Sequence, residues 1–314
     1  MTPTHSTKKR LLTLIGVAVL ALGAKPAAKP PQAFASPEAA VDALAQAARA
    51  SDEKPLLALF GSAAHDIVSS GDAVADANVR ENFAKSYDSK HSLERDGDAK
   101  AILVYGDDDF PFPIPLVKQG DQWHFDAAAG RHEILARRVG RNELATIQVC
   151  LAYVDAQREY ASVDRDGDGL FEYAQKFNSS SAKSHDGLYW PVEPGQPESP
   201  LGELVADARS EGYRHEEGKR KPYHGYLYKI LTKQGPHAAG GAYDYLVRGR
   251  MIGGFALVAY PAEYGVSGIM TFVVNQDGVV FSKDLGPGTT KTAAAMTRFD
   301  PDSTWKKEEP AASQ

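Results

Sequence analysis

A long segment rich in helix-forming residues, Ala127–Tyr160, most constrains what this chain can fold into. Only Gly130 and Gly140 interrupt it, so we expect two helices, the second running from about Asn142 to Tyr160. Helical patterns and then strand patterns precede this segment, and further strand patterns follow it. This order predicts an α+β fold in which a long helix lies between two groups of antiparallel strands.

The residues before the long helix predict several helices followed by an antiparallel sheet. Ser36 is expected to cap a helix with Pro37 at its first position, and Asp76 is expected to cap a later helix. Strands are expected at Ala101–Tyr105, Phe112–Val117 and Gln122–Phe125. This order, with the Trp-x-Phe pattern of the last strand, resembles the cystatin-like cone fold of nuclear-transport-factor-type domains. We expect four side chains to be buried there: Val41, Leu44, Phe83 and Trp123.

The residues after the long helix predict a short helix and a second antiparallel sheet. The helix is expected at Leu201–Arg209, and Asn275-Gln276-Asp277-Gly278 is a strong turn signal between the last two strands. The strands are expected at Tyr226–Leu231, Tyr243–Val247, Gly254–Tyr260, Met270–Val274 and Val279–Lys283. The expected division is therefore 1–35 signal peptide and linker, 36–140 cystatin-like domain, 141–300 second α+β domain with an acidic loop, and 301–314 polar tail.

The N-terminus has the pattern of an export signal. Lys8, Lys9 and Arg10 precede the apolar run Leu11–Leu22, which is shorter than the about 20 residues that a membrane span needs. A small-x-small cleavage site exists at 33–35, and Ala24 lies nearer the apolar run. We expect a periplasmic or secreted protein with no membrane span in the mature chain; an uncleaved N-terminal anchor is the alternative.

The net charge limits which partners we expect, and the cysteine content shows whether disulfides can stabilise the fold. The 314 residues carry a net charge of −6, and residues 1–35 contain five basic residues and no acid, so their removal takes the charge to −11. This charge disfavours polyanions, including nucleic acid, as partners. Cys150 is the only cysteine, so no internal disulfide can form.

An acidic loop after the long helix predicts a calcium site. Asp164, Asp166 and Asp168 occupy positions 1, 3 and 5 of an EF-hand-like loop, with Gly169 at position 6. The further ligands would be the Leu170 carbonyl, Glu172 and Gln175 at positions 7, 9 and 12. An EF-hand has a bidentate Glu at position 12, which Gln cannot replace. We expect a structural Ca²⁺ ion; the alternative is a solvated acidic turn that ends the helix.

Several long stretches resemble one exported bacterial family, catalogued as domain of unknown function 2950, across roughly residues 34–307. They are FPIPLV (Phe112–Val117), NELATIQVCLAYVDAQREYA (Asn142–Ala161), DRDGDGLFEYAQ (Asp164–Gln175), GLYWP (Gly187–Pro191) and the run Gly240–Gly286. The family has no established activity, so the resemblance implies export and a shared fold. The second half is also loosely similar to the soluble domains of type II secretion pseudopilins, which implies a pilin-like sheet. A prepilin-peptidase site and a continuous apolar N-terminal helix are missing from the sequence, which argues against filament assembly by the pilin route.

Three functions stay open. The favoured one is a non-catalytic envelope protein, a calcium-stabilised module that binds an envelope protein or a surface polymer. The second is a small-ligand-binding protein or enzyme that uses a pocket in the N-terminal domain, with His124 as its acid/base candidate. The third is a hydrolase acting at the domain interface with His224 or Asp244.

Overall fold

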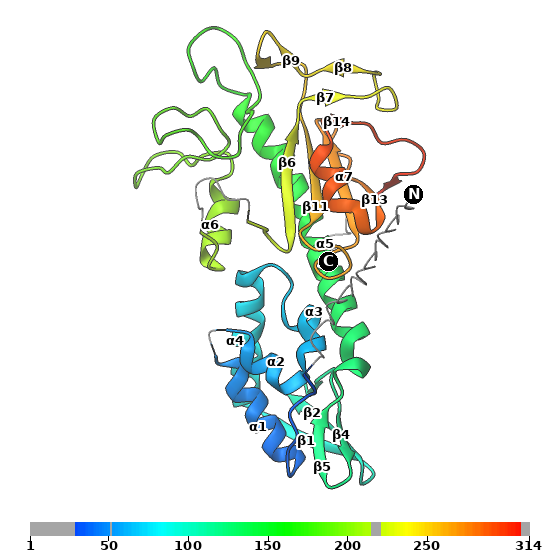
Figure 1. Cartoon of the computed structure of the whole chain (residues 1–314). Helices are drawn as coiled ribbons and strands as arrows, with labels where there is room; N and C mark the ends of the chain where they lie inside the picture. Colours follow the sequence, from blue (N-terminus) through cyan, green and yellow to red (C-terminus); the bar gives the residue numbers. More distant parts are fainter. Residues whose placement is uncertain (1–28, 51, 215–220, 309–314) are drawn as a thin grey trace, which may run out of the picture.

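The computed structural model describes residues 29–50, 52–214 and 221–308. Its first half contains four α-helices and one 3₁₀ turn, followed by an antiparallel sheet with the strand order β1-β2-β4-β5, in which β3 also pairs with β2 (Figure 1). The elements are α1 (Pro37–Ala48), α2 (Lys54–Phe60), η1 (Ser62–Ala64), α3 (His65–Val68), α4 (Ala73–Ser89), β1 (His91–Asp96), β2 (Lys100–Tyr105), β3 (Phe110–Pro111), β4 (Leu116–Gln119) and β5 (Gln122–Phe125).

Local sequence explains where these helices begin. The Ser36 hydroxyl accepts a hydrogen bond from the Ala39 amide, and Pro37 occupies the first turn of α1, as expected. The cap expected at Asp76 was wrong, because Asp72 accepts from the Ala75 amide and α4 starts one residue later. Two aspartates near the start of α4, Asp72 and Asp76, could each cap a helix. The tertiary contacts of Asp72, described in the Discussion, favour Asp72 as the cap.

A single helix, α5 (Ala127–Tyr160, 34 residues), replaces the two helices expected here. A glycine in a helix interior costs only about 1 kcal/mol, and packing at both ends of α5 exceeds that cost. Gly130 is needed for a different reason: a Cβ at this position would lie 2.7 Å from the Pro113 carbonyl oxygen and from the Ile114 side chain. Figure 1 shows α5 running along both halves of the molecule, so the boundary expected near Gly140 falls inside a helix.

The second half is built on a five-stranded antiparallel sheet with the order β15-β13-β12-β11-β6, and α5 packs against β11 and β12. Its elements are α6 (Gly202–Ser210), β6 (Tyr226–Leu231), β7 (Lys233–Gln234), β8 (Tyr243–Asp244), β9 (Leu246–Val247), β10 (Arg250–Met251), β11 (Ala256–Pro261), β12 (Met270–Asn275), β13 (Phe281–Asp284), η2 (Gly286–Gly288), α7 (Thr289–Ala295), β14 (Arg298–Phe299) and β15 (Lys306–Lys307). Strand β14 pairs with β7, which pairs with β8, and β9 pairs with β10. The expected α+β class is confirmed; the cystatin-like cone and the pilin-like sheet stay predictions.

Two separate hydrophobic cores lie on either side of the middle of α5. The first contains Val41, Leu44 and Trp123, which are buried as expected, whereas Phe83 is half-buried at its edge. The second surrounds β11, whose six residues are all buried. Along α5, contacts with the first core extend to Leu135 and contacts with the second begin at Ile147.

Both ends of the described chain belong to the fold. Phe34 is buried and pairs with Trp123, and the Gln32 amide donates to the Ala58 carbonyl over 3.1 Å. At the other end, β15 pairs with β13, so the second half continues past residue 300, where a polar tail was expected. The apolar run Leu11–Leu22 lies outside the described residues, and no helix within the described ranges has the length and apolar character of a membrane span.

Candidate functional site

The acidic loop brings three aspartates together. One oxygen from each of Asp164, Asp166 and Asp168 lies within 4.8 Å of the other two. The Asp164 carboxylate accepts from the Gly167 and Gly169 amides, both over 2.9 Å, and both glycines have positive φ angles that favour Gly. These two hydrogen bonds lower the pKa of the Asp164 carboxyl, so it is ionised at neutral pH.

Arg250 on β10 pairs with the same loop. Its Nη2 lies 2.6 Å from Asp166 Oδ2, its Nε lies 3.1 Å from Glu172 Oε2, and its Nη1 contacts Asp168. One guanidinium therefore compensates part of the charge of three carboxylates. Sequence reasoning missed Arg250 because it lies about eighty residues farther along the chain, on a short strand with no motif of its own.

The other predicted calcium ligands, Leu170, Glu172 and Gln175, make contacts of their own. The Leu170 side chain is exposed, and the Gln175 amide donates to the Gly249 carbonyl over 2.8 Å. This bond joins the end of the loop to the turn before β10, next to Arg250. The calcium ion stays a prediction. Three of its expected ligands, the aspartates, converge, and Glu172 pairs with the same arginine, Arg250, as two of them.

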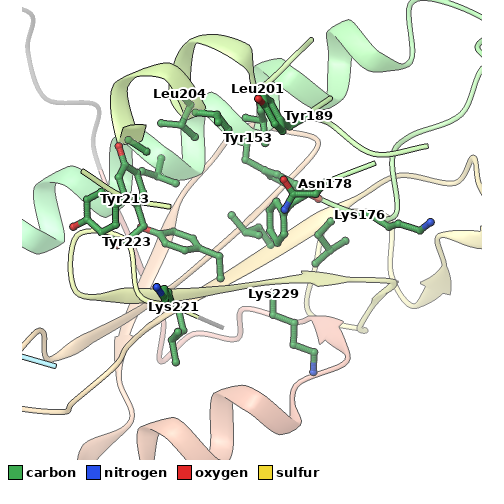
Figure 2. A pocket seen from close by; sticks show the side chains of 18 of the residues that line it. Tyr153, Lys176, Asn178, Tyr189, Leu201, Leu204, Tyr213, Lys221, Tyr223 and Lys229 are labelled. Carbon is green, nitrogen blue, oxygen red and sulfur yellow. The ribbon is translucent and has the colours of Figure 1, made fainter. Parts of the chain in front are cut away.

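A pocket of about 640 Å³ lies between α6, the segment 175–178 and strand β6 (Figure 2). Figure 2 shows Tyr213 and Tyr223 on one side, Lys176 and Asn178 on the other, and Lys221 and Lys229 on the β6 side. Its tyrosines and basic residues are Tyr153, Tyr189, Tyr213, Tyr223, Tyr228, Lys176, Arg209, Arg214, Lys221 and Lys229. The described lining contains no Asp or Glu, so the charged residues that line this pocket are all basic.

The basic side chains of this pocket are held by specific contacts. The Arg209 guanidinium lies 5.1 Å from the centre of the Tyr189 ring, a cation–π distance. Lys176 Nζ lies 2.5 Å from Asp186 Oδ2. Asp186 also accepts hydrogen bonds from the Ser180 amide and hydroxyl and from the Ser184 hydroxyl. The Lys176 contact, and after it these hydrogen bonds, hold the pKa of the Asp186 carboxyl well below its usual range. The Lys229 ammonium points toward α7, where it donates to the Ala294 and Met296 carbonyls, so its stem rather than its charge faces the pocket.

Two phenols of the pocket, those of Tyr153 and Tyr223, are protonated at neutral pH. Burial raises the pKa of the Tyr153 and Tyr223 hydroxyls well above the ordinary value. Neutral phenols supply flat apolar rings and hydrogen bonds, which suits binding. No local motif marked these residues in the sequence; the nearest signal was the high tyrosine content, 14 in the whole chain.

The three acid/base candidates lie on separate elements. His124 is half-buried on β5, opposite Val117. Asp244 on β8 lies 3.2 Å from Lys233, and β8 and β5 are at opposite ends of the molecule (Figure 1). His224 Nδ1 lies 3.9 Å from Glu211 Oε2, beside a second cavity described below. The fold therefore does not assemble them into one catalytic set.

Comparison with known proteins identifies a family. No curated protein and no solved structure matches the chain significantly, so a relationship to the pseudopilins is not shown. A family model described as "Protein of unknown function (DUF2950)" matches residues 31–308, which include both cores, the acidic loop and the tyrosine-lined pocket. The chain therefore belongs to this family, as its long sequence motifs predicted.

Proposed function

We propose that this is an exported, non-catalytic envelope protein that binds a segment of an anionic surface polymer in the tyrosine-lined pocket. The observation that carries the proposal is the composition of the lining: five tyrosines together with Arg209 and Arg214, and no carboxylate among the described residues. The volume of about 640 Å³ lies within the range of small-ligand sites, about 300–1,000 Å³.

The chemistry of the lining favours an anionic ligand built from rings. Tyrosine rings offer flat apolar faces and a polar edge, which suits a sugar or another ring that is apolar on one face. Arg209 and Arg214 line the same pocket and supply planar donors for carboxylate or phosphate groups. The Arg214 guanidinium donates to the Arg209 and Tyr213 carbonyls, which are neutral acceptors.

Binding of defined oligomers tests the proposal. We expect an oligogalacturonate to bind with an affinity that falls as salt is raised, and a neutral cello-oligomer of equal length to bind at least tenfold more weakly. Tyr189→Ala and Arg209→Gln should each weaken oligogalacturonate binding by about fivefold or more, measured by calorimetry. Tyr243→Ala and Lys291→Gln, which change exposed residues outside the pocket, are the matched controls.

Three results would contradict the proposal. They are equal affinity for the neutral and acidic oligomers, unchanged affinity in both pocket variants, and binding of an acidic peptide in place of either oligomer. The last result would favour a protein partner.

A further inference from the structure

A second cavity, of about 630 Å³, lies between α4, α5 and the segment 110–114 in the first half. Tyr213 and His224 from the second half also line it. Helix α4 packs mainly on α1 and the sheet, which leaves space between α4 and α5. Tyr213 lines both this cavity and the polymer pocket, and the other lining residues of the two differ.

The interior of this cavity is aromatic. The Phe83 ring centre lies 4.9 Å from that of Tyr105 and 5.4 Å from that of Phe112, and Phe60 lies beside Phe112. Two further apolar lining residues are left exposed, Val79 at 52% and Phe110 at 39%. Such a continuous apolar wall, partly open to water, favours an apolar ligand.

Arginines surround the apolar wall. Arg137, Arg138 and Arg141 follow one another on one face of α5, and Arg80 comes from α4. Arg138 is buried and donates to the Asp66 and Ile67 carbonyls over 2.6 and 2.7 Å. Arg137 pairs with Glu133 and lies 4.5 Å from the Phe110 ring centre.

Four arginines and two carboxylates line the cavity, so most of its charged groups are basic. Within the described ranges neither Arg80 nor Arg141 has an ion-pair partner within 4 Å. The two lining carboxylates are already in contact with other groups: Asp76 accepts from the Ser70 amide over 2.9 Å, and Glu211 faces His224. An apolar cavity with guanidiniums from α4 and α5 that have no ion-pair partner within 4 Å among the described residues matches a ligand that has one anionic end and one apolar end.

We propose that this cavity binds a single-chain amphipathic anion, with its alkyl chain against Phe83 and Phe112 and its carboxylate or phosphate head on Arg80 and Arg141. The alkyl chain gains stability by leaving water, by about 0.8 kcal/mol per buried CH₂ group. The guanidiniums supply the specificity for a negative head, because each can donate two parallel hydrogen bonds to it.

Four probes separate the contributions of head and chain. Laurate and dodecyl phosphate carry the proposed chemistry with two different heads, dodecyltrimethylammonium reverses the charge, and butyrate shortens the chain. We expect laurate, dodecyl phosphate or both to bind one per chain by calorimetry, each below its micelle concentration. The cationic and short probes should bind at least tenfold more weakly. Whichever of the two anions binds more tightly identifies the preferred head.

Variants locate the site. Arg141→Gln should weaken binding of the anion by about tenfold, and Val79→Trp should abolish it by filling the cavity, while thermal unfolding shows that both variants are folded. Lys85→Gln, on the same helix as Val79 but outside the lining, is the matched control and should bind like wild type. Equal affinity for the cationic probe, no binding of either anion, or unchanged binding in both folded variants would overturn the proposal. Arg141 and Val79 do not line the polymer pocket, so both variants should bind oligogalacturonate like wild type, and failure of one proposal is distinguishable from failure of the other.

Discussion

The Asp72 carboxylate accepts a hydrogen bond of 2.8 Å from the Tyr213 hydroxyl and thereby joins the start of α4 to the segment after α6. The same oxygen of Asp72 accepts from the Gly225 amide over 2.9 Å, and the other oxygen caps α4 at Ala75. Asp72 is 2% exposed, so its carboxylate relies on these donors rather than on water. One buried carboxylate therefore connects the two halves of the molecule.

Loss of this contact should destabilise the protein. Asp72→Ala leaves the Tyr213 hydroxyl and two amides without their acceptor, and we expect a loss of about 3 kcal/mol in the free energy of unfolding. Tyr213→Phe removes one donor and should cost about 1 kcal/mol. Urea denaturation measures both, with Tyr243→Phe, an exposed tyrosine, as the control. Equal stability of Asp72→Ala and wild type would show that this contact is dispensable.

The stability of the first half should depend on pH through Asp76. Burial raises the pKa of the Asp76 carboxyl above its ordinary value. Because the folded pKa exceeds the unfolded one, the contribution of Asp76 is fully present below the unfolded pKa and is lost as pH rises through the folded pKa. Asp76→Asn should therefore gain stability relative to wild type as pH is raised from about 4 to 8, measured by urea denaturation. Asp155→Asn, on the exposed side of α5, is the control; a difference between Asp76→Asn and wild type that stays constant with pH would contradict the prediction.

Arg250 and calcium should compensate for one another at the acidic loop. Arg250→Gln removes the cation that pairs with Asp166, Asp168 and Glu172, so in excess EDTA the variant should melt below wild type. A dissociation constant of about 10⁻⁴–10⁻³ M, as in extracellular modules, implies that 10 mM CaCl₂ adds about 1–3 kcal/mol of stability. Thermal unfolding with EDTA and then with CaCl₂ measures this gain in wild type and in Arg250→Gln.

Asp166→Ala is the control for the calcium test, since it removes one of the three converging carboxylates and should abolish most of the gain. Melting temperatures that do not respond to calcium in wild type or in Arg250→Gln would leave the alternative, an acidic loop that Arg250 alone compensates.

The mature chain should begin upstream of Lys29. Cleavage after Ala35 would remove Phe34, which is buried and exchanges two backbone hydrogen bonds of 2.8 Å with Trp123. Loss of the Phe34 side chain alone should cost about 2 kcal/mol. Mass spectrometry of the protein from a cell-envelope fraction of its host should give a start near residue 25, and a chain that starts at Ser36 should unfold at lower urea concentration. A full-length protein in the cytoplasm would contradict export.

Patterns within short stretches of sequence determined much of this fold. A short run of aromatic and aliphatic residues located β6 at its observed bounds, Tyr226–Leu231, and Ser36 with Pro37 located the start of α1. The D-x-D-x-D-G spacing predicted that Asp164, Asp166 and Asp168 converge, because residues this close in a tight turn cannot separate. The long motifs also identified the family. Each helix, strand and turn among these conclusions depends on residues that are close to one another in the sequence.

Only the tertiary structure showed which distant residues form ion pairs, hydrogen bonds and cavities with one another. Sequence spacing could not show that Arg250 reaches the acidic loop, that Tyr213 donates to Asp72 across 141 residues, or that Arg80 and Arg141 share a cavity. The continuity of α5 through Gly140 was also a tertiary outcome, since the small helix penalty of glycine is outweighed by packing against two cores. The physical reason is the same in each case: helix and strand patterns arise from neighbours along the chain, whereas ion pairs and cavities arise where distant segments meet.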